Sequence, residues 1–265
     1  MSRLVLLAPP SLNRFQRAVV EHVLAHRRGD VVGCVIDARP PRPAWERIRS
    51  NLKRGRGGYV VVMAAGLLLR RRRPTVATGP LLAAAGAEVI ATADPCDPAT
   101  AAAIAGLAPD VLLLVGGFGI VKEPLLSLCP GGVLSYHHGD MRAYRGQPPA
   151  FWELYHGEPS MGVTVQRLAA GIDCGTPIVE RRFEIAPHDT VRSLSRRIHD
   201  GSADMLLAAV DRVERGEAGE PLAQLGRVYT LPNLREWLTC QLRVARRASR
   251  ARARSLVRTL LAART

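Results

Sequence analysis

The sequence predicts a doubly wound α/β domain with a mostly parallel sheet, and three observations carry this prediction. Short apolar, β-branched runs recur along the first half of the chain, as expected for strands buried on both faces. Helical patterns separate these runs, which is the order that βαβ units require. The 265 residues are 47% apolar and 23% charged, a composition that suits one large domain and excludes a disordered chain or a polytopic membrane protein.

The first half of the chain alternates strand and helix. Asn13 precedes a run with apolar residues at helical spacing, which predicts a helix between the first two strands. An alanine-rich helix is expected over residues 98–107, between two later strands. Ligands bind at the carboxyl ends of the strands in such sheets. The predicted strands cover residues 3–8, 30–37, 87–94, 109–119 and 131–140.

The second half predicts an antiparallel addition to this sheet. Residues 160–168 and 176–185 alternate in hairpin style around the turn "AAGIDCG". Apolar residues at helical spacing predict one closing helix from Thr190 to Arg215. We therefore expect an α/β catalytic domain over residues 1–225 and a basic helical extension over residues 226–265.

Two segments interrupt this pattern and carry the basic charge. The chain has 37 Lys and Arg against 23 Asp and Glu, a formal net charge of +14. Residues 42–73 hold a net charge of +9 and residues 233–265 a net charge of +8, which leaves −3 for the rest. The first segment predicts a basic helical insertion at about 40–74, which includes an apolar run at 59–69. The second predicts an amphipathic helix over 234–261, with arginines between its leucines.

The cysteines and the N-terminus indicate a cytoplasmic protein. The five cysteines are odd in number and far apart, which gives neither a disulfide framework nor a CxxC metal pair. The N-terminal apolar run has five residues, too few for a signal peptide. The run at 59–69 is too short to cross a bilayer of roughly 30 Å as a helix. We expect neither export nor a membrane-spanning segment.

Two histidines and one aspartate are the first candidates for chemistry. His137 and His138 follow a predicted buried strand, at the sheet edge where titratable groups usually act. Asp173 lies in the glycine-flanked turn of the hairpin. A carboxylate that fixes a histidine tautomer gives a general acid or base with a pKa near neutrality. On residue types alone the alternative stays open that the histidines are structural and that Asp173 caps backbone amides.

Three motifs follow one another between residues 131 and 185. The first, "SYHHGDMRAYRG", places His137 before the aromatic-Arg-Gly triplet that begins at Tyr144. The second, "QPPAFWELYHGEPSMGVTV", joins a Pro-rich helix start to a "GVT" strand, and the third, "GIDCG", holds Asp173. In this order the motifs resemble the folate-dependent formyltransferase family, which includes methionyl-tRNA, glycinamide-ribonucleotide and sugar-amine enzymes. Upstream, "DVLLLVGGFGIV" is similar to the strand and loop that line the family's pterin pocket.

One position departs from the family pattern. The family has Asn two residues before the catalytic His, whereas this chain has Ser135. In the family that Asn donates a hydrogen bond to the formyl oxygen as negative charge develops there, and one such donor is typically worth ~3 kcal/mol in the transition state. A serine hydroxyl also donates but reaches less far, and the adjacent His138 is a candidate to compensate.

The resemblance implies direct formyl transfer from 10-formyltetrahydrofolate to a primary amine, with no metal required. It implies that His137, helped by Ser135, stabilises the oxyanion and that Asp173 holds His137 and helps to take up the amine proton. The expected catalytic residues are His137, Asp173 and Ser135; the expected donor-binding residues are Gly117, Phe118, Gly119 and Ile120; and the expected acceptor-binding residues are His138, Tyr144, Arg145 and Gln147.

The acceptor is expected to be a small amine, such as an amino sugar or a specialised metabolite. Hydrolysis of formyl-folate, or transfer of another one-carbon or acyl unit, remains an alternative on the same fold. An inactive formyltransferase-like scaffold that binds anionic membrane or RNA is a third. Methionyl-tRNA enzymes carry a C-terminal β-barrel, and the helical tail here disfavours tRNA and nucleic acid as partners.

The basic segments allow three interpretations: a solvated charged face, contacts with RNA phosphates, or a membrane anchor. Two amphipathic segments, 59–73 and 234–261, are what stable peripheral binding to an anionic membrane needs. Each cation near the lipid contributes ~1 kcal/mol. The predicted localisation is cytoplasmic, either free or peripheral at the inner membrane face. The sequence carries no signal for an oligomer.

Overall fold

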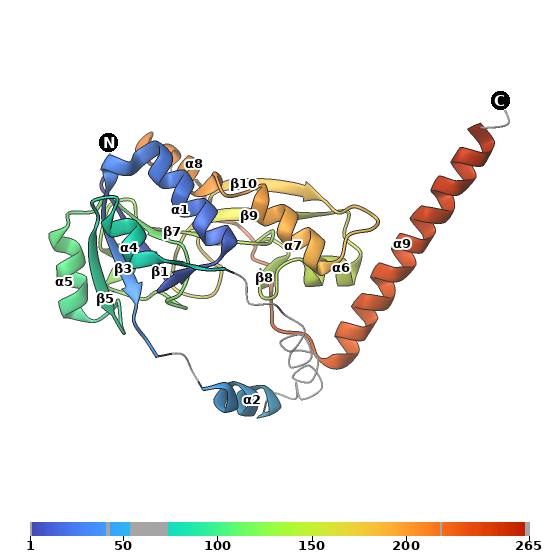
Figure 1. Cartoon of the computed structure of the whole chain (residues 1–265), viewed down its shortest axis with the longest axis horizontal. Helices are drawn as coiled ribbons and strands as arrows, with labels where there is room; N and C mark the ends of the chain where they lie inside the picture. Colours follow the sequence, from blue (N-terminus) through green and yellow to red (C-terminus); the bar gives the residue numbers. More distant parts are fainter. Residues whose placement is uncertain (1, 41–42, 54–73, 218, 263–265) are drawn as a thin grey trace.

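The computed structural model describes residues 2–40, 43–53, 74–217 and 219–262 (Figure 1). Within these residues seven strands form one sheet in the order β10-β9-β7-β6-β1-β3-β5. The strands from β7 to β5 are parallel, and β9 and β10 extend them antiparallel, so the predicted mostly parallel sheet is confirmed. The strands are β1 (Leu4–Ala8), β3 (Val31–Asp37), β5 (Glu88–Thr92), β6 (Val111–Leu114), β7 (Val133–His137), β9 (Ser160–Arg167) and β10 (Thr176–Glu184).

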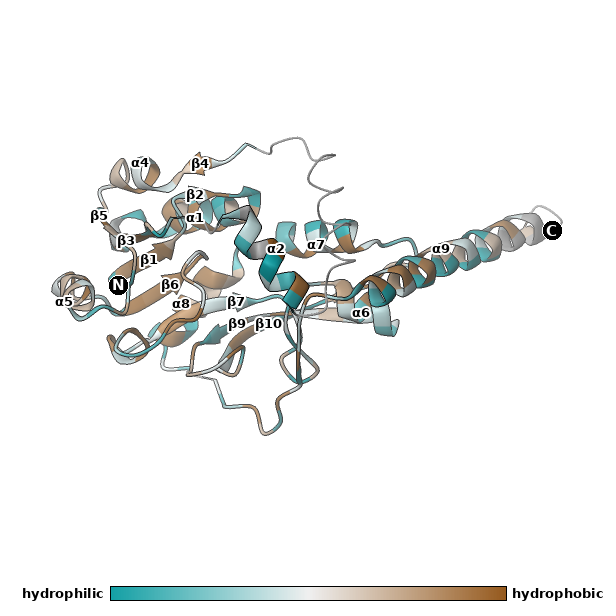
Figure 2. Cartoon of the chain, turned by 90° about the horizontal axis from the view of Figure 1, so that it is seen from below, coloured by the Kyte–Doolittle hydropathy of each residue, from teal (hydrophilic) through white to brown (hydrophobic). Residues whose placement is uncertain are grey.

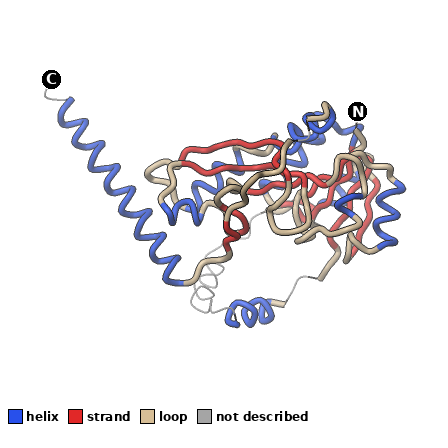
Figure 3. The backbone as a smooth tube through the Cα atoms, turned by 180° about the vertical axis from the view of Figure 1, so that it is seen from behind, coloured by secondary structure: helices blue, strands red, loops and turns tan. Residues whose placement is uncertain are grey.

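Helices and two short strand pairs surround this sheet, which Figure 3 shows as one continuous layer of strands. The helices are α1 (Arg14–Arg27), α2 (Ala44–Lys53), α4 (Thr78–Ala83), α5 (Pro98–Gly106), α6 (Phe151–His156), α7 (Val191–Asp200), α8 (Met205–Glu214) and α9 (Leu234–Ala262), with the 3-10 turns η1 (Arg28–Asp30) and η2 (Leu125–Ser127). The short pairs are antiparallel β2 (Ser11–Leu12) with β4 (Val76–Ala77) and parallel β8 (Tyr144–Gly146) with β11 (Arg227–Tyr229).

Alternation along β1 explains why the sheet has a core on each face. All five residues of β1 are fully buried. Leu4 and Leu6 point into the core shared with α1, α7 and α8, whereas Val5 and Leu7 point into the core shared with α5 and η2. A strand that is apolar at every position is stable only between two layers. The continuous apolar run is therefore the cause of the three-layer arrangement.

Helix ends follow the capping signals in the sequence. Asn13 and Gln16 form a reciprocal capping box at the start of α1, and Asp97 caps α5 just before Pro98. The predicted single helix from Thr190 to Arg215 is wrong, because it is broken into α7 and α8 between residues 200 and 205. Glycine at position 201 ends α7, since glycine is a poor helix former and a good C-cap.

Two helices lie outside the body of the sheet. The N-terminal part of α9 packs against α6 through buried Cys240 and Val244, and the helix then extends away from the body (Figure 1). The tail prediction of a helix over 234–261 is confirmed. Helix α2 provides the predicted basic helix of the insertion. The apolar run at 59–69 lies outside the described residues.

Candidate active site

His137 is the last residue of β7, the strand at which the sheet changes from parallel to antiparallel. Strand β7 pairs with the parallel strand β6 on one side and with the antiparallel strand β9 on the other. Ser135 lies two residues earlier and therefore on the same face of the strand. Both side chains are buried, and Gln166 of β9 lies opposite Ser135 in the register. The strand order thus brings Ser135, His137 and Gln166 to one sheet edge.

Both ring nitrogens of His137 face acceptors. Nδ1 lies 3.2 Å from Oδ2 of Asp173, and Nε2 lies 2.7 Å from the carbonyl oxygen of Tyr144. Burial alone would lower the pKa of His137, but the hydrogen bond and the charge of Asp173 outweigh it and raise this pKa above its ordinary value. The surroundings therefore favour the imidazolium form, which can donate from both nitrogens.

The Asp173 carboxylate is held by donors on each oxygen. The Gly146 amide donates to Oδ2 at 2.8 Å, and Nε2 of Gln166 donates to Oδ1 at 3.3 Å. Burial would raise the pKa of Asp173, but His137 and these donors lower it below its ordinary value. Asp173 also has a left-handed backbone with φ of +44°. Few non-glycine residues adopt this left-handed conformation, and those that do cluster at active sites and ligand-binding segments.

Arg145 fastens the turn that carries Asp173. Its Nε donates to the carbonyl oxygen of Asp173 at 2.8 Å, and its Nη2 donates to that of Ile172 at 2.5 Å. Nη1 reaches the carbonyl oxygen of Gly226 at 3.3 Å. The guanidinium thus joins the turn that carries Asp173 to the segment before β11. The contact of Arg145 with an acceptor stays a prediction. Its contacts in the structure are with backbone carbonyls and hold two loop segments together, a role here called the Arg145 clamp.

Tyr144 and Gln147 lie on either side of Arg145 and Gly146. The Tyr144 hydroxyl donates to Glu158 at 2.7 Å and lies 3.0 Å from Nδ1 of His156. Its ring stacks on Tyr229 with ring centroids 5.4 Å apart. Gln147 lines the cavity beside His137, where its side chain is available to a ligand. Tyr144 therefore positions His137 through its carbonyl, whereas Gln147 remains a candidate acceptor contact.

His138 belongs to an aromatic cluster with Phe15, Tyr136 and His199. Ring centroids lie 5.1 Å from Phe15, 5.6 Å from Tyr136 and 4.7 Å from His199. Burial lowers the pKa of His138 to about 3, so this ring is neutral at physiological pH. His138 follows the last residue of β7 and, like Ser135 and His137, it lines the cavity. Its contact with an acceptor stays a prediction.

The predicted donor-binding loop divides into two parts. Gly119 and Ile120 line the cavity, and Ile120 is exposed. Phe118 instead packs into the core shared with α5, and the Gly117 carbonyl accepts from Arg39 at 2.9 Å. Two of the four residues therefore reach the cavity, and the other two support the loop.

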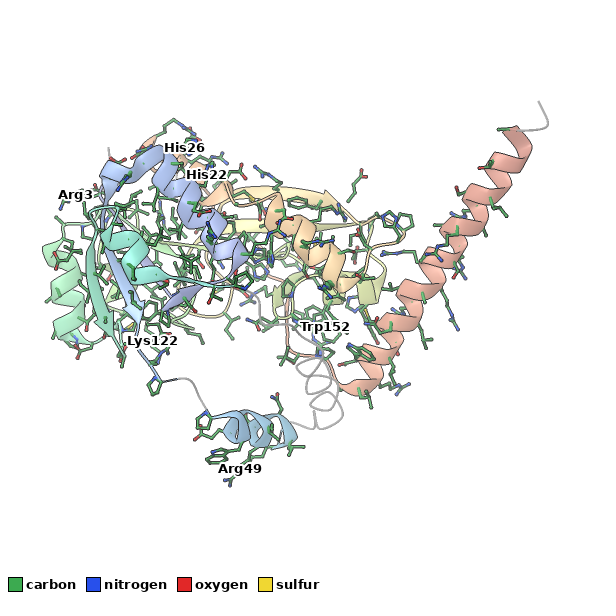
Figure 4. All side chains as sticks on the ribbon, viewed as in Figure 1. Arg3, His22, His26, Arg49, Lys122 and Trp152 are labelled. Atoms are coloured by element: carbon green, nitrogen blue, oxygen red, sulfur yellow. The ribbon has the colours of Figure 1, made fainter. Side chains whose placement is uncertain are left out.

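The cavity that contains these residues has a volume of about 630 Å³. It joins the end of β7 to the Asp173 turn and to the segment that includes β11. Sequence reasoning missed Gln166 and the segment 228–231, which forms one wall. Trp152 fixes this wall, because its Nε1 donates to the carbonyl oxygen of Thr230 at 3.0 Å; Figure 4 shows Trp152 where the body meets the start of α9.

Comparison with known proteins decides the family of this chain. The family model described as formyl transferase matches residues 57–210, more than half of the sequence. The chain belongs to the formyl transferase family. As in the motif analysis, the matched region contains Ser135, His137 and Asp173. The predicted family is therefore confirmed.

Relatives of this formyl transferase family member include methionyl-tRNA formyltransferases. One from Anaeromyxobacter dehalogenans is 33% identical over 140 residues, which are 53% of this chain and 45% of that protein. The match with one from Koribacter versatilis is 33% identical over 115 residues, 43% of this chain and 37% of that protein. The chain thus spans less than half the length of these curated relatives.

Solved structures with the formyl transferase fold superpose on most of the chain. Glycinamide ribonucleotide transformylase 1 from Symbiobacterium toebii has a TM-score of 0.57 at 21% identity, covering 86% of this chain and 95% of its own. An N-formyltransferase from Helicobacter canadensis, solved with folinic acid and dTDP-3-aminofucose, has a TM-score of 0.57 at 13% identity, covering 92% of this chain and 80% of its own. These likenesses show a shared fold.

Glu153 of α6 gives a pH-dependent stability prediction. Burial raises the pKa of its carboxyl from 4.5 to about 7, so folding takes up a proton between these two values. Stability consequently falls as pH rises through this window. We expect Glu153→Gln to be more stable than wild type by roughly 3 kcal/mol at pH 8, with the difference vanishing near pH 4.5. Urea denaturation at both pH values measures the free energy of unfolding of wild type and variant. An equal difference between the two proteins at pH 8 and pH 4.5 would contradict this prediction.

Proposed function

We propose that this chain transfers the formyl group of 10-formyltetrahydrofolate to a primary amine of a small molecule. The observation that carries the proposal is the buried pair of His137 and Asp173 beside Ser135 in one cavity. Family membership supports it, since the similar proteins are named formyltransferases. The arrangement suits acyl transfer, because it offers cationic and hydroxyl donors next to an ionised carboxylate.

The cavity has features that fit a formyl-folate. Apolar Leu114, Ile120 and Leu168 line it next to His137, a surface suited to a flat heteroaromatic ring. The volume of about 630 Å³ also leaves room for part of an acceptor. A bound formyl-folate would supply the activated formyl carbon. The folinic acid in the Helicobacter canadensis structure supports this class of donor.

His137, Ser135 and Asp173 would have different roles in the reaction. His137 would donate to the formyl oxygen as negative charge develops there, with the Ser135 hydroxyl as second donor. To do so, Nε2 of His137 exchanges its present acceptor, the Tyr144 carbonyl, for the formyl oxygen. Asp173 holds the ring through Nδ1 and helps to take up the proton that the attacking amine releases. The bond between the formyl carbon and N10 of the folate would then break, and N10 would take up a proton so that tetrahydrofolate leaves.

An amino sugar is the acceptor that we favour. Among the described residues that line the cavity, none is Lys or Arg, so the part of the acceptor beside His137 is uncharged apart from its amine. Gln147, Tyr229 and Thr230 offer polar groups for sugar hydroxyls. The dTDP-3-aminofucose in the Helicobacter canadensis structure supports this acceptor class.

Release of tetrahydrofolate tests the proposal directly. Purified protein is incubated with 10-formyltetrahydrofolate and a panel of amino-sugar nucleotides, with His137→Ala as the inactive control. Amine-dependent release that disappears in the control is the expected result. Release without an amine would replace the proposal by formyl-folate hydrolysis. No turnover with any amine would favour an inactive scaffold.

Ser135→Asn is expected to raise activity. Asn reaches further than Ser toward the position of the formyl oxygen, and a well-placed donor is worth ~3 kcal/mol in the transition state. We expect kcat to rise by about tenfold, with Ser135→Ala falling below wild type as the matched control. Equal kcat for wild type and Ser135→Asn would show that the hydroxyl already serves as a full donor.

We also propose that the protein associates with anionic membrane. Leu238, Leu242 and Leu256 are exposed along α9, and Figure 2 shows hydrophobic and hydrophilic residues following one another along this helix. The other predicted anchor, 59–73, lies outside the described residues, and none of the described helices is long and apolar enough to cross a bilayer. Flotation with phosphatidylglycerol vesicles tests association. Protein that stays in the soluble fraction at low salt would overturn it.

A further inference from the structure

A second cavity lies between α9 and the body, away from the catalytic site. It has a volume of about 900 Å³ and is bounded by the end of α6, by Pro187 and by α9. Five arginines line it: Arg243, Arg246, Arg247, Arg250 and Arg254, here called the arginine groove. Among the described residues, none lines both this groove and the catalytic cavity.

The carboxylate that acts on Arg247 of the arginine groove, Asp189, is outside the groove lining and is ion-paired with Arg197. No Asp or Glu lines the groove in the described part of the chain. Arg246, Arg250 and Arg254 form no ion pair with a described carboxylate, whereas arginines of the body such as Arg142 and Arg181 do. Like charges gathered around a concave surface raise the local potential and attract anions. The charge and the shape of the arginine groove therefore suit an anionic ligand.

Two of the arginines are held in place by backbone carbonyls. Arg247 donates to the carbonyl oxygens of Pro187 at 3.2 Å and Asp189 at 3.0 Å. Arg243 donates to the Tyr155 carbonyl and lies over the Tyr155 ring, 4.7 Å from its centroid. Their guanidinium groups are therefore ordered before a ligand arrives, which reduces the entropy lost on binding.

The shape of α9 separates the groove from the leucine face. Arg243, Arg247, Arg250 and Arg254 recur at spacings of four, three and four residues, which places them on one face of the helix. Leu238 and Leu256 are exposed on nearly the opposite face, since each residue turns the helix by about 100°, whereas Leu242 and Arg246 lie between the two faces. A flat lipid surface that met Leu238 and Leu256 would not reach these four arginines.

We propose that the arginine groove binds a soluble small molecule with several phosphates, of the nucleoside polyphosphate class. Guanidinium groups bind phosphate oxygens in bidentate pairs, and clustered phosphates engage several at once. Leu154, Pro187 and Val244 provide an apolar wall for the base, and the volume is that of a ligand of this size. This inference is independent of the proposed formyl transfer.

Calorimetric titration of the full-length protein with ATP, inorganic tripolyphosphate and AMP tests the proposal. At about 150 mM salt, ATP and tripolyphosphate bind with a Kd below about 1 mM, and AMP binds at least about tenfold more weakly. The double variant Arg250→Glu/Arg254→Glu weakens ATP binding by at least about tenfold. The matched control Arg235→Glu/Arg252→Glu changes the net charge equally on the same helix but outside the groove, and stays within about threefold of wild type.

Three outcomes overturn the proposal. If both double variants weaken ATP binding equally, binding depends on the net charge of the protein and not on the arginine groove. If neither ATP nor tripolyphosphate gives a heat of binding, the groove does not bind polyphosphates. Binding confined to phosphatidylglycerol vesicles or to single-stranded RNA would assign the arginines to a macromolecular surface. Circular dichroism of both variants checks that α9 is retained, and the formyl-transfer assay is not needed for any of these readings.

Discussion

Asp173→Asn is expected to lower formyl transfer by about 10³-fold. The Asp173 carboxylate accepts from Nδ1 of His137 and raises the pKa of this imidazole more than the Tyr144 carbonyl or Glu153 does. The amide that replaces it carries no charge, so the pKa of His137 falls and the imidazolium form is lost at lower pH. As the pH is raised, the residual kcat of the variant should therefore begin to fall at a lower pH than the kcat of the wild type.

Two measurements separate this effect from a general loss of structure. NMR titration of the His137 ring measures its pKa in wild type and variant, and the pH profile of kcat measures the activity. Glu180→Gln removes the same charge from an exposed ion pair with Arg142 and serves as the control. An unchanged His137 titration in Asp173→Asn would contradict the assigned role of the carboxylate.

Gly139→Ala is expected to lower activity by about 10²-fold through displacement of His137. A Cβ atom at position 139 would lie 2.5 Å from Nε2 of His137 and 2.7 Å from the carbonyl oxygen of Tyr144. One of these two atoms must move, and the hydrogen bond between them holds the His137 ring in position. Misplacement of a reacting group by about 1 Å is enough for a loss of this size.

The control for this variant is Gly106→Ala at the end of α5. A Cβ there meets nothing within 4 Å, so activity should stay at the wild-type level. Thermal melting of both variants shows whether the fold is kept. Wild-type kcat in Gly139→Ala would mean that the ring tolerates the methyl group, and the tight packing around His137 would then have no catalytic role.

The sheet could be predicted from the sequence because its strands carry continuous apolar runs. Leu4 to Ala8 and Val111 to Leu114 are apolar at every position, and only a sheet covered on both faces buries such a run. His137 and Asp173 could be found because their motifs stand in a family order. Their direct contact at 3.2 Å is the structural result that the spacing alone could not supply.

The remaining parts of the site depend on contacts between distant segments. Strand β11 pairs with β8 over 3-residue strands, and the residues Tyr144 and Arg227 in that register are 83 positions apart. Strands this short carry no periodicity. The acceptors of Arg145 could not be predicted from the sequence, because they are backbone carbonyls, which every residue has. The break at Gly201 was missed because the apolar spacing of α7 and α8 continues across it.

The order of the strands also sets the order in which the site can assemble during folding. Strands β7, β8, β9 and β10 follow one another within residues 133–184, so the histidine and its carboxylate meet through a short loop. The pairing of Leu4 with Val111 closes a much longer one. Local pairings form early and distant ones late. We therefore expect His137 and Asp173 to meet early in folding, and the β11 wall, which pairs with β8 from a distant part of the chain, to complete the cavity last.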